Sequence, residues 1–192
     1  ALAEETGGRM KLLAAGDQAS TFTQVMSGQI DLGWAAPPFG LKEIAEGKIR
    51  HIALSNETAW GAAKWLALAQ THGLPRMATV QNEYSLLCRH FDTDWAELSA
   101  LEEMPLLAFS PLATGLLTGK YAGDVTPEGS RRALNADLSG RVTPQVFPAV
   151  AAYMGIAARL GKRHLSFALS QAFHFLARFL CRTMVATNAF FV

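Results

Sequence analysis

Three side chains with the chemistry to bind a ligand stand at the ends of predicted strands. Asn56, Gln81 and Phe109 each end or directly follow a short apolar run. The two amides supply hydrogen-bond donors and acceptors, and the phenyl ring supplies a flat apolar surface, so together they can hold a planar ring with a polar substituent. Because parallel strands end at one edge of a sheet, we expect the three side chains to converge there.

A turn rich in Gly and Ser follows the last of these runs, in the sequence SPLATGLLTGKY. Backbone N–H groups in such a turn, together with a nearby cation, can hold an anion. The alternative is a loop whose Ser and Gly residues serve turn geometry alone. The residues of this turn that we consider candidates for anion binding are Ser110, Pro111, Leu112, Gly115 and Lys120.

Strands and helices alternate along the chain at the spacing of βα units. Strands are predicted over 10–15, 30–36, 49–54, 77–81 and 105–109, and helices after 17, then over 40–46, 59–71, 92–103, 145–160 and 165–180. In helix 92–103 we expect Asp92 to cap the first turn and Trp95, Leu98 and Leu101 to share one apolar face. The pattern predicts an α/β fold with a mostly parallel sheet, either an incomplete TIM-type barrel or an open doubly wound sheet. About five units favour the open sheet, since a closed barrel needs eight.

The composition excludes several classes of protein. The chain has 192 residues, and its 17 basic and 16 acidic side chains are scattered, so nucleic acid is not an expected partner. Cys88 and Cys181 are far apart and are expected to be buried free thiols, with no metal site. No export signal and no uninterrupted apolar stretch of membrane-spanning length is present, which predicts a soluble, cytoplasmic protein.

Residues 1–47 resemble an internal piece of a periplasmic solute-binding protein of the nitrate, sulfonate and taurine importer type. The run GDQASTFTQVMSGQIDLGWAAPP carries this resemblance. It implies a βαβα fragment that lines part of a ligand cleft, with Gln18, Ser20, Thr21 and the strand end Trp34 to Pro38 near a small anion. On chemistry alone, the first three are ordinary residues of a helix start.

Residues 48–192 resemble the C-terminal half of an aldo/keto reductase, of a bacterial group similar to the potassium-channel beta-subunit branch. Four separated motifs carry this resemblance in the family's order: GKIRHIALSNETAWG, VQNEYSLL, LLAFSPLATGLLTGKY and PEGSR. The resemblance implies an NADP(H) site in which Ser55, Asn56 and Gln81 contact the nicotinamide carboxamide. Phe109 would stack on the ring in place of the usual Tyr, and the turn ending at Lys120 would contact the pyrophosphate.

The same resemblance implies NADPH-dependent reduction of an aldehyde or ketone, but the catalytic Tyr, Lys, His and Asp of the family find no match upstream of Ser55. No catalytic residue is therefore assigned, and whether the chain is an enzyme stays open. We expect His51 and Tyr84 to be structural. Arg131 and Arg132 are expected to be solvated surface residues.

The two resemblances meet at GKIR, so we interpret the chain as a chimera joined near residues 46–50. Three functions follow: an aldo/keto reductase-like domain with a partial NADP(H) site, an anion-binding or sulfonate-binding module of an ABC importer type, or a chimeric fragment without a selected function. The expected partner is a small-molecule substrate or a nucleotide. An exposed sheet edge would also allow a homo-oligomer.

Overall fold

The fold is described from a computed structural model, which describes residues 16–31, 33–34, 40–49, 51–163 and 189–191. The chain divides into two compact units. One unit comprises residues 1–53 with 185–192, and the other comprises residues 54–184. The predicted strand 10–15, the predicted helix 165–180 and Cys181 lie outside the described residues.

The first unit combines short helices with parallel strands. Its elements are α2 (Gln18–Met26), β1 (Gly33–Trp34), α3 (Leu41–Ala45), the first part of β2 (His51–Ser55) and β5 (Ala189–Phe191). β5 pairs in parallel with both β1 and β2. Asp17 caps α2, since its carboxylate accepts a hydrogen bond from the Ser20 N–H at 2.8 Å. Gly33 lets α2 pack on β1, because a Cβ there would lie 2.6 Å from the side chain of Val25.

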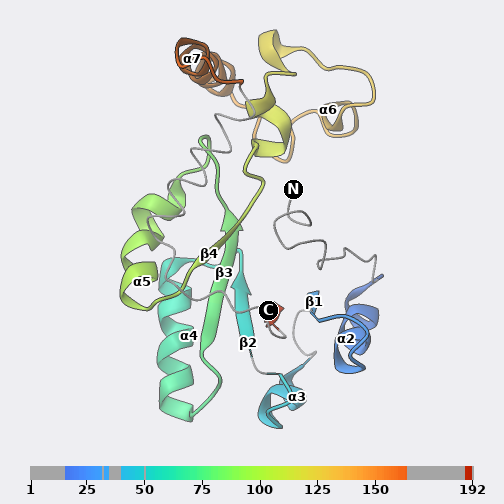
Figure 1. Ribbon diagram of the computed structural model, residues 1–192, viewed down its shortest axis with the longest axis vertical. Helices are drawn as coiled ribbons and strands as arrows, with labels where there is room; N and C mark the ends of the chain where they lie inside the picture. The colour runs from blue at the N-terminus through green and yellow to red at the C-terminus, as the bar shows by residue number, and fades with distance from the viewer. Residues whose placement is uncertain (1–15, 32, 35–39, 50, 164–188, 192) are drawn as a thin grey trace. The chain divides into compact units, whose positions relative to one another are not determined.

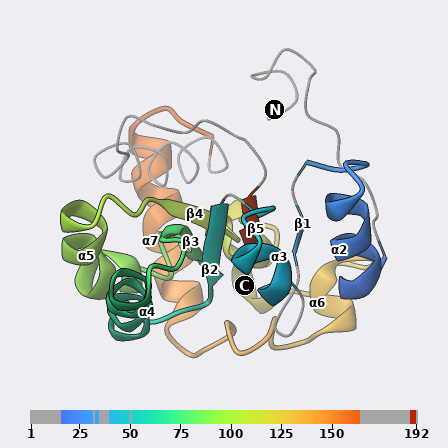
Figure 2. The same ribbon diagram turned by 90° about the horizontal axis from the view of Figure 1, so that it is seen from below.

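The second unit contains the end of β2, two further parallel strands and the helices that cover them. Its first elements are α4 (Ala59–His72), β3 (Met77–Glu83), the π-helical turn η1 (Phe91–Trp95), α5 (Ala96–Leu101) and β4 (Leu106–Phe109). β3 pairs in parallel with β4, and the Asn56 N–H at the end of β2 donates to the Gln81 carbonyl of β3 at 2.9 Å. α4 and α5 lie on one side of β3 and β4 (Figures 1 and 2). The predicted α/β fold with parallel strand pairing is confirmed.

α4 begins and ends where its local sequence predicts. The Thr58 hydroxyl accepts a hydrogen bond from the Gly61 N–H at 3.0 Å and so caps the first turn. Gly73 ends the helix in the left-handed conformation, with φ 63°. Ala62, Leu66 and Ala69 are the buried residues of this helix.

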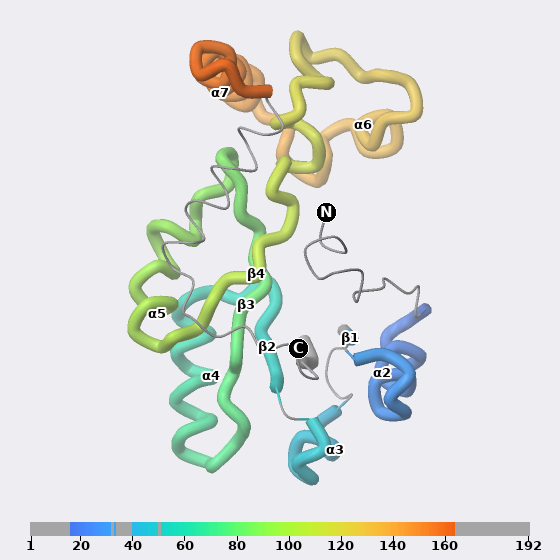
Figure 3. The backbone as a smooth tube through the Cα atoms, in the orientation of Figure 1, coloured from blue at the N-terminus to red at the C-terminus, as the bar shows by residue number. Residues whose placement is uncertain are grey.

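The remainder of the second unit packs around a separate apolar core. It consists of η2 (Ala113–Thr118), η3 (Ala122–Asp124), α6 (Arg131–Leu134) and α7 (Val146–Arg159), which lie beyond the carboxyl ends of β3 and β4 (Figure 3). Nine buried residues form the core: Leu86, Ala113, Leu116, Leu117, Tyr121, Leu138, Val146, Val150 and Ala157. The long predicted loop after Tyr121 is thus folded against α7.

The expected helix 92–103 is wrong in its first turn and in one face residue. Asp92 is no helix cap, because it lies inside η1 and its carboxylate accepts hydrogen bonds from the Tyr84 hydroxyl, at 3.0 Å, and from Arg89. The wider π turn stacks Phe91 on Trp95, with ring centroids 6.1 Å apart. Leu101, expected on the apolar face, is 75% exposed. Helical periodicity did not predict the first turn, because the Asp92 carboxylate bonds Tyr84 and Arg89 instead of capping the helix.

The described residues contain neither a membrane-spanning helix nor a cluster of metal ligands. None of the described helices is both long and apolar enough to span a membrane. Within the same residues, no three His, Cys, Asp or Glu side chains stand together as metal ligands would. Cys88 is a half-buried free thiol.

Candidate functional site

The turn after β2 carries Ser55 and Asn56 at the carboxyl edge of the strand. Asn56 adopts the left-handed conformation with φ 53°, which Asn tolerates better than most residues. Its amide Nδ2 donates to the Ser55 hydroxyl at 3.3 Å, and its peptide N–H donates to the Gln81 carbonyl at 2.9 Å. The strand ends of β2 and β3 are therefore joined at the two positions that the sequence singled out.

The peptide of Glu57 in this turn is held by side chains from elsewhere in the unit. The Glu57 N–H donates to Asn82 Oδ1 at 3.1 Å, and the Glu57 carbonyl accepts from Asn82 Nδ2 at 2.9 Å. The indole Nε1 of Trp95 donates to the same carbonyl at 3.2 Å. Sequence reasoning missed both residues, since Asn82 stood next to the candidate Gln81 and Trp95 read as a core residue.

Gln81 and Phe109 share the face of the sheet opposite to the helices. Paired residues on neighbouring strands point to the same face, and successive residues alternate. Val80 and Leu106 pair with each other, are buried, and lie on the same face as Asn82, whose amide bonds the Glu57 backbone together with Trp95 of η1. Gln81, one position later, and Phe109, which pairs with Glu83, therefore point to the other side, where both are half-buried.

The turn after β4 is held in an unusual backbone conformation. Ser110 has φ 51° and Gly115 has φ 102°, and the N–H groups of Ala113 and Gly115 donate to carbonyls within the turn. A Cβ at Gly115 would lie 2.7 Å from Cε of Lys120. Glycine at this position therefore lets the exposed Lys120 side chain fold back over the turn. Pro111 and Leu112, which complete the candidate set, are half-buried between these residues.

Tyr121 lies under the Lys120 side chain, whose Nζ is 4.9 Å from the centre of the Tyr121 ring. Burial raises the pKa of the Tyr121 phenol. The neighbouring Lys120 ammonium, the Arg132 peptide N–H and the Ser130 hydroxyl together lower this pKa by more than burial raises it, so the net pKa falls below its usual value. In the described part of the chain, the buried Tyr121 and Ser130 hydroxyls have no hydrogen-bond partner of good geometry.

An ion pair at the same edge ties the long segment after Tyr121 to β3. Arg141 Nε and Nη2 donate to the two carboxylate oxygens of Glu83 at 2.8 and 2.6 Å, and Arg141 Nη1 donates to the Leu138 carbonyl at 2.8 Å. Both charged side chains are about a quarter exposed, at 23% and 22%. Because Glu83 pairs with Phe109 in the sheet, this ion pair borders the candidate site.

Arg132 is not the solvated surface residue that the sequence suggested. Its side chain is only 11% exposed, and it forms an ion pair with Asp124. It also donates to the carbonyls of Val125 and Ala136, at 3.1 and 3.2 Å, and lies over the Phe147 ring. This expectation was wrong because the segment folds back on itself and surrounds the guanidinium with carbonyls. Arg131, its neighbour, is exposed.

Tyr84 and His51 are two further residues whose side chains could donate a proton, and both are packed within the fold. Tyr84 is 2% exposed and donates its hydroxyl to Asp92; burial and then this carboxylate raise its pKa to about 12. His51 lies half-buried in β2. The described residues at the strand ends therefore supply groups for binding, while the proton donor of a reductase is not among the residues assigned.

The residues of the anion-binding alternative lie in the first unit. Gln18, Ser20 and Thr21 form the first turn of α2, where the Ser20 and Thr21 N–H groups donate to Asp17. Residues 35–38 of the expected strand end lie outside the described part of the chain, and of Trp34 only the backbone is described.

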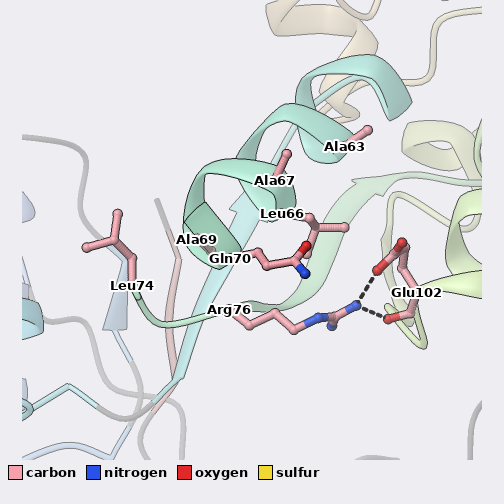
Figure 4. A pocket seen from close by; sticks show the side chains of 8 residues that line it. All are labelled: Ala63, Leu66, Ala67, Ala69, Gln70, Leu74, Arg76 and Glu102. Carbon is pink, nitrogen blue, oxygen red and sulfur yellow. Dashed lines mark hydrogen bonds and ion pairs between the residues drawn. The ribbon is translucent and has the colours of Figure 1, made fainter. Parts of the chain in front are cut away.

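A hollow of about 450 Å³ lies on the helical side of the second unit, away from the strand ends (Figure 4). Eight residues line it: Ala63, Leu66, Ala67, Ala69, Gln70, Leu74, Arg76 and Glu102. Arg76 and Glu102, its charged residues, already pair with each other at 2.8 Å. The hollow thus offers mostly apolar side chains, the Gln70 amide and an ion pair that is already formed.

Comparison with known proteins assigns the chain to a family. A model of the Aldo/keto reductase family matches residues 40–178, well over half of the chain. The chain therefore belongs to the aldo/keto reductase family. "Protein tas" of Escherichia coli (strain K12) is 49% identical over 115 residues, which cover 60% of this chain and 33% of that protein. An "Aldo-keto reductase" of Babesia bovis is 34% identical over 163 residues, covering 77% of this chain and 53% of that protein.

A solved structure agrees with this assignment at the level of the fold. The glycerol dehydrogenase AKR11B4 from Gluconobacter oxydans superposes with a TM-score of 0.55 and 20% sequence identity, covering 96% of this chain and 58% of that chain. At that identity the similarity concerns the fold alone. The chain spans about a third to a half of the length of the two curated relatives described above.

Proposed function

We propose that the second unit binds NADP(H) at the carboxyl ends of β2, β3 and β4, as part of an aldo/keto reductase. The observation that carries this proposal is that Asn56, Gln81 and Phe109 stand at or near the carboxyl ends of three neighbouring strands. Ligands of α/β proteins bind at such edges. The chemistry of these side chains fits the cofactor, since two carboxamides and a ring match the carboxamide and the flat face of nicotinamide.

Each candidate residue would have a separate binding role. Asn56 and Gln81 would exchange hydrogen bonds with the nicotinamide carboxamide, with Ser55 orienting the Asn56 amide through the bond at 3.3 Å. Phe109 would support the ring by stacking. Lys120 would supply a cation for the pyrophosphate, together with peptide N–H groups of the turn 110–115 that are not used within it.

The proposed activity follows from this binding. When bound, NADPH supplies a hydride, and the proposed substrate is an aldehyde or a ketone. The residues of this chain would hold the nicotinamide ring at the strand ends and keep the pyrophosphate on the turn after β4. No proton donor is assigned among the described residues, so binding of the cofactor is the part of the function that this chain can be tested for directly.

The test is a fluorescence titration of the chain with NADPH, with the Asn56→Gly variant as control. Glycine keeps the left-handed backbone at position 56 and removes only the carboxamide. We expect the wild-type chain to bind NADPH and the variant to bind it about tenfold more weakly, as expected for one or two lost hydrogen bonds. Absence of binding by the wild-type chain would remove the proposal.

We also retain the division of the chain into a solute-binding-like part, residues 1–47, and a reductase part, residues 48–192, as a proposal. The family match begins at residue 40, a few residues before this boundary. Calorimetry with nitrate and a small sulfonate tests the importer-type alternative, and lack of binding would exclude it. A homo-oligomer and a cytoplasmic location remain predictions, the first of which a measured solution mass would test.

A further inference from the structure

Asn82 holds the turn that carries Asn56, the residue proposed to bind the nicotinamide. Its own side chain points to the face of the sheet opposite to Gln81 and Phe109. It lies between Gln81 and Glu83 in β3, and alternation turns its amide toward α4 and α5. There it bonds both backbone polar groups of Glu57, accepting from the N–H at 3.1 Å and donating to the carbonyl at 2.9 Å. A single side chain thus holds the two successive peptides that flank the Glu57 Cα.

Trp95 adds a third bond and links this arrangement to the π-helical turn. Its indole Nε1 donates to the Glu57 carbonyl at 3.2 Å, so that this oxygen accepts two hydrogen bonds. The indole is itself fixed by stacking on Phe91 and is only 3% exposed. The π turn therefore has a role, since it aims a buried indole N–H at the turn after β2.

The consequence for Asn56 is geometric. The peptide before Asn56 is held because the Asn56 N–H donates to the Gln81 carbonyl, and the peptide after it is held because the Glu57 N–H donates to Asn82. The two hydrogen bonds to the Glu57 carbonyl hold the next peptide along the turn. With both neighbouring peptides fixed, the backbone of Asn56 has little freedom, and these hydrogen bonds hold its φ at 53°. A left-handed conformation of a residue other than glycine is unfavourable in isolation and persists when its surroundings determine it.

We propose that Asn82, assisted by Trp95, is a positioning residue that preorganises Asn56 for the nicotinamide carboxamide. This inference rests on the proposed NADP(H) function of the same edge. Neither Asn82 nor Trp95 touches the cofactor in this arrangement, so both act through the backbone of Glu57, Asn82 at its N–H and carbonyl and Trp95 at its carbonyl. Their effect should therefore be confined to the nicotinamide end of the ligand, because the pyrophosphate and adenosine would be held by other residues.

The experiment compares Asn82→Ala, Trp95→Phe and a control, Asn135→Ala, with the wild-type chain. Asn135 makes two side-chain hydrogen bonds with Ser139, at 3.1 and 3.3 Å, in the segment after Tyr121. The control thus removes as many amide hydrogen bonds as Asn82→Ala does. Phenylalanine at position 95 keeps an aromatic ring that can stack and removes the indole donor together with the pyrrole ring.

The first measurement is amide hydrogen exchange in the free protein, which requires no ligand. We expect exchange of the Glu57 N–H to become at least about tenfold faster in Asn82→Ala and to change less in Trp95→Phe, which leaves this donor bonded. The amides of β4 should keep their protection, which shows that the variant is folded. Unchanged exchange at Asn56 and Glu57 would overturn the inference whatever the ligand does.

The second measurement is the affinity for NADPH and for 2′-phospho-ADP-ribose, which lacks the nicotinamide. We expect Asn82→Ala to weaken NADPH binding about tenfold and to leave 2′-phospho-ADP-ribose unchanged. Asn82→Asp keeps the acceptor for the Glu57 N–H but loses the donor, so it should lie between Asn82→Ala and the wild type. Equal loss for both ligands, or no loss for NADPH, would overturn the positioning role.

The two proposals fail in distinguishable ways. If the wild-type chain binds neither ligand, the proposed function falls, and with it the role of Asn82 toward a cofactor. If the wild type binds NADPH and Asn82→Ala binds it equally well, only the inference about Asn82 falls. A loss of NADPH affinity in Asn135→Ala would likewise count against it, since that variant leaves the Glu57 peptide untouched.

Discussion

The ion pair between Glu83 and Arg141 should couple the segment after Tyr121 to the sheet. Two parallel hydrogen bonds, at 2.8 and 2.6 Å, join side chains that are only about a quarter exposed. Exposed pairs contribute about 0–1 kcal/mol and removal of one partner of a buried pair costs about 3–5 kcal/mol, so this half-buried bidentate pair should lie near 2 kcal/mol. Glu83→Gln and Arg141→Gln should each destabilise the fold by about that amount.

A double-mutant cycle measured by thermal unfolding tests this estimate. A loss of about 2 kcal/mol should lower the melting temperature by about 4–8 °C in a chain of this length. The matched control is the pair Arg76 and Glu102, with a similar distance of 2.8 Å but side chains 48% and 44% exposed. Its coupling free energy should stay below about 1 kcal/mol. A coupling at Glu83 and Arg141 no larger than in the control would refute the reasoning from burial.

Three further predictions concern single positions. Folding raises the pKa of Tyr84 from 10.0 to about 12, so its contribution to stability should be complete below pH 10 and lost as the pH rises to about 12. Unfolding measured as a function of pH should show this alkaline loss in the wild type and not in Tyr84→Phe. Gly33→Ala would place a Cβ 2.6 Å from a side chain of α2 and should destabilise the fold by about 1–3 kcal/mol, whereas Gly155→Ala in α7 should be neutral or stabilising in the same unfolding assay. Burial, and then the charge of Glu83, raises the pKa of the Cys88 thiol. Alkylation of Cys88 by iodoacetamide should therefore be slow at pH 8 and faster in Glu83→Gln. The rate is measured in a background in which Cys181 is replaced by serine.

Features that depend on neighbouring residues in the sequence could be predicted. The capping of α4 by Thr58 and its end at Gly73 follow from the local preferences of Thr and Gly, and both are found. The strands that end near Asn56, Gln81 and Phe109 could be predicted from short apolar runs that are broken by polar residues. The resemblance to aldo/keto reductases rested on separated motifs, and the family match over residues 40–178 confirms it.

Features that depend on distant residues could not be predicted. Asn82 bonds a peptide 25 residues away, Trp95 reaches the same peptide from 38 residues away, and Arg141 pairs with a carboxylate 58 residues away. An Asn in a strand, a Trp in a helix and an Arg in a polar segment each have many possible partners, and the sequence contains no signal that selects one. The same reason explains the errors at Asp92 and Arg132, whose side chains are used by tertiary contacts.

Local signals in the sequence predicted the α/β class and the strand ends that we propose as the binding edge, because apolar runs, glycines and caps act over a few residues, and separated motifs predicted the family. The tertiary structure set which side chains lie on each face of that edge. It turned Gln81 and Phe109 to the open face through the register of β3 and β4, and it turned Asn82 to the opposite face. The cause is the pleat of the strand, since one position along the chain separates the Gln81 amide, which we propose faces the ligand, from the Asn82 amide, which holds the backbone.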